Sequence, residues 1–482
     1  MKKRSQAYKL GNFQIPKNMV PVAFLIIVFT VISFLVSFKA ILAHNGTEML
    51  LVLPASFGML LLLSGWKFLR MPLNFGAILV VGIEFVKLVL VPFFFVLANY
   101  PRTITYNAMY NDYYGILLQM YEAFWIGYAL NRGCKYKQYK LDVANIDKSS
   151  SNKKLKNIMI VILILTIIIC VLAPEILFNY RSILSASDSE YTNIEQDYIV
   201  NMYATSTTKK LFLVIANYWL KPMRLILPAY AIVIAARYVN RVFAKIISFI
   251  LVLSPFIFVD GTVARSLYFT IVLFLLYNYL FTVNPKNLVR LIAAATLFII
   301  IYWCVRYYAV PRDNSLFEYF AEKLNDYFCG FNIVGGTLNL PGNIKYRNKY
   351  FIQDFTRTIP FANTIFGMDG LDTIRVFFNT YNHTTGGQIA STLGMGSYYL
   401  SPLLAPVYSY VFTRNTINYA GLANDIKNPY YKLVYYFIAL YFGLGVGLND
   451  ISVTLANLVQ VCLPIFIIIN MAYPRTKEWG KR

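Results

Sequence analysis

The 482-residue sequence has little charge, few acids and almost no histidine. Charged residues make up 14% of the chain and hydrophobic residues 58%, with a mean hydropathy of +0.54. This composition excludes an ordinary soluble domain, in which about 25% of the residues are charged. Two histidines and five scattered cysteines show neither the spacing of a metal site nor a disulfide framework. We therefore expect chemistry that needs no metal and no other cofactor.

Long apolar runs are what the chain has instead. A run of roughly 17–25 residues can cross a bilayer as a helix. Twelve such runs occur, at 19–42, 48–65, 77–98, 108–130, 157–179, 211–236, 243–259, 266–283, 289–306, 396–413, 431–449 and 452–472. They are too long and too uniformly apolar for barrel strands. The sequence predicts an all-α polytopic membrane protein of about twelve transmembrane helices, forming a single domain over 1–482.

The basic residues predict how these helices are oriented. The chain has 44 Lys and Arg against 22 Asp and Glu, a net charge of +22. With cytoplasmic termini, 27 of the 44 fall in the two ends and the five inner connections, as the positive-inside rule requires. The surplus thus reflects topology, with some attraction to anionic lipid, and we expect no nucleic-acid partner.

Two connections stand out. Residues 131–156 form a basic linker that this topology places in the cytoplasm. Residues 307–395, between the ninth and tenth spans, form one large extracytoplasmic loop rich in Tyr and Phe. Within it, 315–331 has apolar residues at helical spacing, which predicts a helix lying on the membrane or on the bundle. A long ordered loop is a common place for a functional site.

Three cations fall where membrane proteins rarely put them. Arg265 follows Asp260 in FVDGTVARS, at the outer end of a span. Lys221 and Arg224 share a face of the sixth span, between two prolines that predict a broken helix lining a cavity. Arg224 is 13 residues from the cytoplasmic Arg237, or roughly 20 Å, which puts it in the outer half of the bilayer.

Each cation has a plainer reading beside the functional one. Arg265 suits an interfacial anchor, and Lys221 with Arg224 suits structural pairing. A lipid-linked phosphate or pyrophosphate would also fit, because its tail stays in lipid while arginine grips its oxygens. The large loop adds further cations at Arg306, Arg312, Arg357 and Arg375, and a basic run at Lys345, Arg347 and Lys349 that we interpret as a solvated face.

Two further features carry possible chemistry. His383 lies in NTYNHTTGG, a polar turn, where a neutral imidazole could act as general base or simply be a hydrogen-bonded loop residue. The carboxylates Asp260, Asp354 and Asp372 are the next candidates for that base. In the third span, Glu84 and Lys87 are three residues apart, which indicates a structural ion pair, with a proton or ion pathway as the alternative.

The chain resembles the Wzy-type oligosaccharide repeat-unit polymerases and O-antigen-ligase-like glycosyltransferases of bacterial surface polysaccharide pathways. FVDGTVARSLYFTIVLFLL is similar to the small-residue and arginine segment that opens a span in that family. GQIASTLGMGSYYLSPLLAPVYSYVF is similar to the glycine-rich segment that closes its large loop. The span number, cytoplasmic ends and late outer loop match over most of the chain. The family's paired arginine-rich outer loops are not evident.

The resemblance implies polymerisation of polyprenyl-pyrophosphate-linked repeat units in the bacterial cytoplasmic membrane, for capsule, exopolysaccharide or O-antigen. Pyrophosphate would be held by Lys221, Arg224, Arg265, Arg312 and Arg375, while His383, Arg265 and Asp260 would be catalytic. Tyr346, Tyr350 and Tyr381 could stack on sugars. A flippase and a chain-length regulator would be partners. The main alternative is a lipid-linked oligosaccharide flippase or other transporter. A third class, transferases that use polyprenyl monophosphate sugars, tends to have acids in the first outer loop, where this chain has only Glu48.

Overall fold

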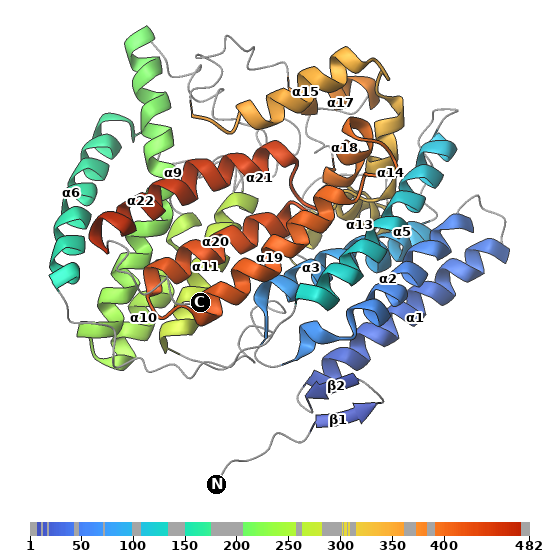
Figure 1. Ribbon diagram of the computed structural model, residues 1–482, viewed down its shortest axis with the longest axis horizontal. Helices are drawn as coiled ribbons and strands as arrows, with labels where there is room; N and C mark the ends of the chain where they lie inside the picture. Colours follow the sequence, from blue (N-terminus) through green and yellow to red (C-terminus); the bar gives the residue numbers. More distant parts are fainter. Residues whose placement is uncertain are drawn as a thin grey trace. The chain divides into compact units, whose positions relative to one another are not determined.

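The structure is a computed structural model, and it is almost entirely helical where it describes the chain (Figure 1). The described residues are 7–10, 13–16, 19–42, 48–70, 73–98, 108–133, 150–174, 206–256, 263–281, 301, 303–305, 307–308, 315–360, 373–382 and 391–473. A two-stranded antiparallel hairpin, β1 (Ala7–Leu10) with β2 (Phe13–Pro16), precedes the first helix. The predicted helical class is confirmed, with this hairpin as the exception.

Among the residues that the structure describes, five helical stretches are long and apolar enough to cross a membrane. They are Val20–Lys39, Phe75–Ala98, Lys153–Leu172, Leu211–Tyr238 and Ile451–Ala472. In the first and third stretches only 22% of the most apolar part is buried inside the structure. Aliphatic side chains there, such as Leu25 and Ile164, are about half exposed, as lipid-facing residues are. These features identify a membrane protein.

The chain divides into two compact units. The first unit comprises Met1–Gln138, Trp303–Gly421 and Ala439–Ala456, and the second comprises Tyr139–Tyr302, Leu422–Ile438 and Asn457–Arg482. The boundary after Gln138 falls inside the predicted linker 131–156. Of that linker, 134–149 lie outside the described residues, whereas its two ends are helical.

The first unit begins with a group of packed helices. These are α1 (Val20–Leu42), α2 (Val52–Ser64), α3 (Phe75–Phe85), α4 (Val91–Ala98) and α5 (Ala108–Gly133), with a π-helical turn, η4 (Val86–Leu90), joining α3 to α4. A short helix, α14 (Phe331–Gly335), crosses α5 at very close range. A Cβ atom on Gly115 would overlap the Phe331 carbonyl oxygen, and one on Gly335 would overlap that of Asn111. Glycine is required on both helices for this approach.

In the described part of the predicted outer loop, four helices occur besides α14, the last of which continues beyond residue 395. They are α13 (Leu316–Tyr327), α15 (Ile344–Thr356), α17 (Ile374–Asn382) and α18 (Thr392–Tyr399). The amphipathic helix expected at 315–331 is confirmed, and a capping box of Ser315 with Glu318 fixes its start. Its Phe320 is buried and stacks on Phe94 of α4 at 5.6 Å, so this helix lies on the bundle.

The second unit is arranged around α9 (Thr207–Tyr238). This helix packs against α6 (Ser150–Leu172), α10 (Arg241–Val252), α11 (Val263–Phe281), a π-helical turn η9 (Leu458–Cys462) and α22 (Leu463–Ala472). The helix α20 (Pro429–Leu444) contributes its first part, while α19 (Val407–Asp425) and α21 (Ile451–Asn457) belong mainly to the first unit.

Two predictions about helices are wrong. The expected span 396–413 is not one helix, because α18 ends at Tyr399 and α19 begins at Val407. Pro402 and Pro406 lie at this break, and each proline lacks an N–H and disfavours helical backbone in the residue before it. Conversely, α9 continues through Pro222 and Pro228, where a break was expected. Each proline removes one backbone hydrogen bond, and packing against the neighbouring elements holds the helix together.

Candidate functional site

The cations predicted on the sixth span lie on α9 in the second unit. Arg224 is buried, with 5% of its surface exposed. The ammonium of Lys221 donates a hydrogen bond to Gln460 Oε1 at 2.8 Å and lies 5.0 Å from the centre of the Tyr218 ring. Gln460 belongs to the π-helical turn η9, a feature that often accompanies functional sites. A neutral amide and a ring therefore help to orient this lysine.

The other predicted pyrophosphate ligands are placed only in part. Arg265 is on the first turn of α11, which packs against α9, and its side chain lies outside the described part of the structure. Arg375, on α17 of the first unit, is partly buried. Asp260, Arg312 and His383 lie outside the described residues. The structure therefore brings the helices of Arg224 and Arg265 together, and their joint role stays a prediction.

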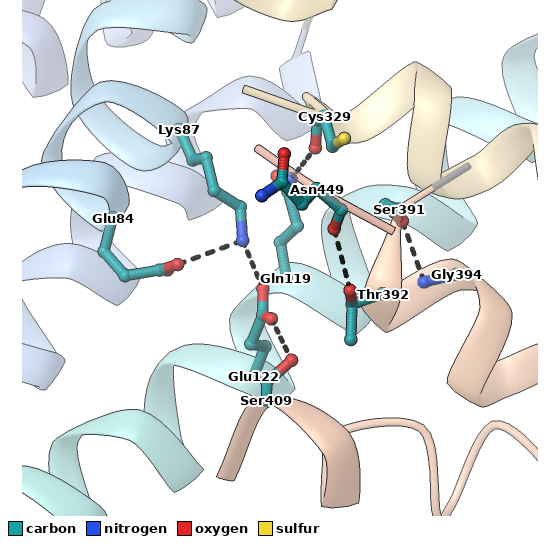
Figure 2. A network of polar contacts seen from close by, with 10 residues as sticks. All are labelled: Glu84, Lys87, Gln119, Glu122, Cys329, Ser391, Thr392, Gly394, Ser409 and Asn449. Atoms are coloured by element: carbon teal, nitrogen blue, oxygen red, sulfur yellow. Dashed lines mark hydrogen bonds and ion pairs between the residues drawn. The ribbon is translucent and has the colours of Figure 1, made fainter. Parts of the chain in front are cut away.

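A network of buried charged side chains lies in the interior of the first unit (Figure 2). The ammonium of Lys87 donates to Glu84 Oε1 at 3.0 Å and to Glu122 Oε2 at 2.5 Å. The second oxygen of Glu122 accepts a hydrogen bond from the Ser409 hydroxyl. Glu84 and Glu122 are 0% exposed and Lys87 is 1% exposed. The predicted pair is confirmed and is part of a trio from α3, η4 and α5.

Neutral polar groups surround the trio. Gln119, one turn before Glu122 on α5, donates to the Cys329 carbonyl oxygen at 3.1 Å. The Asn449 carbonyl oxygen accepts a bond from Thr392 at 3.0 Å (Figure 2). Burial raises the pKa of the Cys329 thiol to about 12, while the charge of Lys87 opposes the rise and that of Asp450 adds to it. Cys329 is therefore a neutral thiol close to both charges.

Asp354, in the predicted loop, is a further buried acid outside this network. It lies near the end of α15, is 2% exposed, and accepts a hydrogen bond from the Tyr399 hydroxyl at 2.7 Å. Burial raises the pKa of its carboxyl to about 8, and the negative charge of Asp450 adds to the rise. The Tyr399 hydrogen bond and the Arg357 guanidinium oppose it. A carboxyl that titrates near neutral pH is suited to general acid–base chemistry.

Asp450 has a clear structural role of its own. Its Oδ1 accepts hydrogen bonds from the Val453 amide at 2.6 Å and from the Ser452 hydroxyl at 3.2 Å. It therefore caps the start of α21, where the helix dipole favours a carboxylate. Burial is the main reason that the pKa of Asp354 is raised, and the nearby charge of Asp450 adds to this effect.

The three tyrosines expected to stack on sugars differ in exposure. Tyr350 is buried against Phe377, with ring centres 4.4 Å apart, so it is a core residue. Tyr346 and Tyr381 are 38% and 40% exposed and contact the same Phe377 at 5.6 and 4.9 Å. Two of the three thus offer accessible ring surface.

The basic run of the loop lies on one helix, α15. Lys345 and Lys349 are exposed, while Arg347 lies over the Tyr398 ring at 5.4 Å. The solvated-face interpretation therefore holds for the two lysines, and Arg347 is the partly buried member of the run.

Sequence reasoning missed the partners that distant helices bring. Glu122 and Gln119 lie in the fourth apolar run, and an acid inside such a run is a signal that could have identified the network. Gln460 and Tyr399 carry no comparable signal. Among the described residues, no group of three or more His, Cys, Asp and Glu side chains is placed to hold a metal ion. No protein family, curated protein or solved structure matches the chain.

Proposed function

We propose that the chain is a membrane glycosyltransferase that polymerises polyprenyl-pyrophosphate-linked oligosaccharide repeat units for a bacterial surface polysaccharide. The observation that carries the proposal is Asp354, a buried carboxyl with a pKa raised to about 8 in the helical segment between apolar runs. Such a group can take a proton from a sugar hydroxyl, a step that a purely structural loop does not need.

The reaction assigned to the site is a glycosyl transfer. A sugar hydroxyl of the incoming repeat unit attacks the anomeric carbon of the growing glycan. The new C–O bond forms as the bond to pyrophosphate breaks, and the polyprenyl pyrophosphate leaves with the electron pair. The hydroxyl proton passes to a base, for which we propose Asp354 with its partner Tyr399. His383, the base expected from the sequence, is the rival candidate.

The leaving pyrophosphate is proposed to bind the cations that were expected from the sequence. Lys221 and Arg224 on α9, with Arg265 on the adjacent α11, would bind its oxygens and stabilise the charge that develops as it leaves. Lys221 suits this role because its ammonium lies one helical turn from the buried Arg224 on α9 and is oriented by the Gln460 amide. Arg312 and Arg375 are proposed as additional ligands on the loop.

The topology belongs to the same proposal. About twelve spans with both termini and 131–156 in the cytoplasm would place 307–395 on the outer face of the bacterial cytoplasmic membrane. Lipid-linked repeat units would be substrates, and a flippase and a chain-length regulator would act before and beside this chain. Exposed Tyr346 and Tyr381 would contact sugar rings.

One observation favours a second candidate, a transporter of lipid-linked oligosaccharide. Charged side chains inside membrane helices often mark ion or proton pathways, and the Glu84–Lys87–Glu122 trio is such a feature. A transporter would move its substrate unchanged, whereas a polymerase lengthens it.

The variant Asp354→Asn tests the proposal. It preserves an oxygen that can accept the Tyr399 hydrogen bond and removes the titratable proton. We expect polymer formation to fall about 10²–10⁴-fold, the usual contribution of a positioned base. The matched control is Glu322→Gln on α13, where a partly exposed acid 3.7 Å from Lys323 is replaced. Equal activity of Asp354→Asn and the control would show that Asp354 is only structural.

A further inference from the structure

The buried trio Glu84, Lys87 and Glu122 contains more acid than base. If all three side chains were ionised, two carboxylates and one ammonium would leave one negative charge with no exposed surface. An uncompensated charge in the interior of a protein, and above all within a membrane span, is strongly unfavourable. One positive charge is therefore missing from the trio, and a proton is the smallest group that supplies it.

The hydrogen bonds show which carboxyl would carry that proton. Both oxygens of Glu122 accept bonds, one from Lys87 and the other from Ser409. Glu84 accepts one bond, at Oε1, while its Oε2 is buried and has no hydrogen-bond partner among the described residues. An ionised oxygen without a donor is costlier to bury than a protonated one. The asymmetry assigns the ionised state to Glu122 and the protonated state to Glu84.

The surroundings of the trio are polar enough for a proton to be exchanged. Lys87 lies on the π-helical turn η4, which leaves the regular α-helical pattern at this position. Gln119 Oε1 and Asn449 Nδ2 are also buried and have no partner among the described residues, so each could bind a water molecule. Within the described part of the chain, the Cys329 thiol interacts with Lys87 and Glu122, and the charges of Asp450 and Asp326 lie close to that thiol.

We propose that the trio is a binding site for one exchangeable proton, carried by Glu84 and held in place by an ionised Lys87–Glu122 pair. This role goes beyond the proposed glycosyl transfer and does not depend on it. Releasing the proton would leave the trio with a net charge of −1 inside the bundle. Packing of α3, α5 and α19 around it would then differ between the two protonation states.

Infrared difference spectroscopy of the purified full-length chain, stepped between acidic and alkaline pH, tests this site directly. A buried protonated carboxyl has its own C=O stretching band. We expect Glu84→Gln to lack one such band that the wild type has, and Asp354→Asn to retain it. Glu122→Gln should also lose it, because Glu84 must then ionise to balance the Lys87 ammonium.

Lys87→Gln provides an independent variant with the opposite outcome. Without the ammonium, Glu122 should also take up a proton, so the carboxyl band should about double in intensity. An unchanged band in both Glu84→Gln and Lys87→Gln would overturn the proposal. A second outcome would also overturn it. In that outcome the wild type lacks the band and becomes more thermally stable with sodium chloride but not with choline chloride, whereas Glu84→Gln shows no such stabilisation. That result would assign the site to a metal cation.

Discussion

At the scale of the residue, the protonation of Asp354 is the property that matters most. Burial and the charge of Asp450 raise the pKa of its carboxyl to about 8, so the carboxyl is mostly neutral below that pH. Below this value the group is an acid, and above it the group is a carboxylate that can accept a proton. Tyr399, whose hydroxyl donates a hydrogen bond to Asp354 at 2.7 Å, is partly exposed at the end of α18, whereas the preceding residues of that helix are buried.

The pH dependence of transfer should identify the base. If Asp354 accepts the proton, the rate is lost as pH falls through the folded pKa, so it should rise with pH and level off above about 8. A base at His383 would move this limb to about 6.5, the ordinary value for histidine. The measurement is the initial rate of glycan elongation at pH values from about 5 to about 9.

Two variants make the assignment decisive. Asp354→Asn should abolish the limb near 8, while His383→Ala should leave its position unchanged. A limb near 6.5 that disappears in His383→Ala would contradict the role given to Asp354 and restore the sequence-based expectation.

Single residues also show where sequence reasoning stops. The Glu84–Lys87 pair was predictable because three residues along a helix bring two side chains together. Glu122 and Ser409 join it from α5 and α19, and no local pattern encodes that meeting. Asp450, whose charge helps to raise the pKa of Asp354, likewise lies almost 100 positions later in the chain, directly before α21.

At the scale of the element, close helix crossings organise the first unit. The three glycines of the FGLGVGLND segment allow close contact between helices. A Cβ at Gly443, Gly445 or Gly447 would indeed press on the side chains of Leu79, Phe412 or Ile83. The crossing of α5 with α14 is tighter still, since there a Cβ would meet backbone rather than a side chain that can move.

Gly335→Ala should therefore destabilise the protein. The added methyl group would overlap the Asn111 carbonyl oxygen, so α14 must move away from α5, and overpacking of this kind costs about 1–3 kcal/mol. Thermal unfolding in detergent is the measurement. Gly58→Ala on α2 is the matched control, because no atom lies within 4 Å of its Cβ position. Alanine there should be neutral or stabilise the helix by up to about 1 kcal/mol. Equal melting temperatures for the two variants would contradict the crossing.

Element boundaries were predictable where hydrophobicity alone decides them. The first apolar run, 19–42, corresponds to α1, and the third, 77–98, to α3, η4 and α4. Prolines were harder to interpret, because their effect depends on packing: α9 continues through two, whereas the chain breaks between α18 and α19 at two others. Neither π-helical turn has a sequence signature, since each follows from contacts made by the folded bundle.

At the scale of the whole molecule, the class was predictable and the arrangement was not. Hydrophobic runs and low charge are enough to identify a helical membrane protein. The division into two units, with α20 shared between them in sequence, depends on contacts between distant segments. Topology rests on charge bias, which concerns the membrane and not the fold.

Cysteine labelling of intact cells checks that topology. Lys345→Cys should react with a membrane-impermeant maleimide, because residue 345 is exposed on α15 and is assigned to the outer face. Lys148→Cys should react only after the membrane is opened, and the wild type corrects for its five native cysteines. The reverse pattern would place Asp354 in the cytoplasm and remove the proposed substrate from its reach.

The central claim is that this chain lengthens a lipid-linked glycan by itself. The direct measurement is to incubate the purified protein with polyprenyl-pyrophosphate-linked repeat units, without nucleotide and with a metal chelator, and to separate the products by size. The account predicts a ladder of products that differ by one repeat unit, with free polyprenyl pyrophosphate released at each step and no ladder with Asp354→Asn. Substrate that stays one repeat unit long, but crosses the bilayer when the protein is reconstituted in vesicles, would contradict the polymerase and identify a transporter.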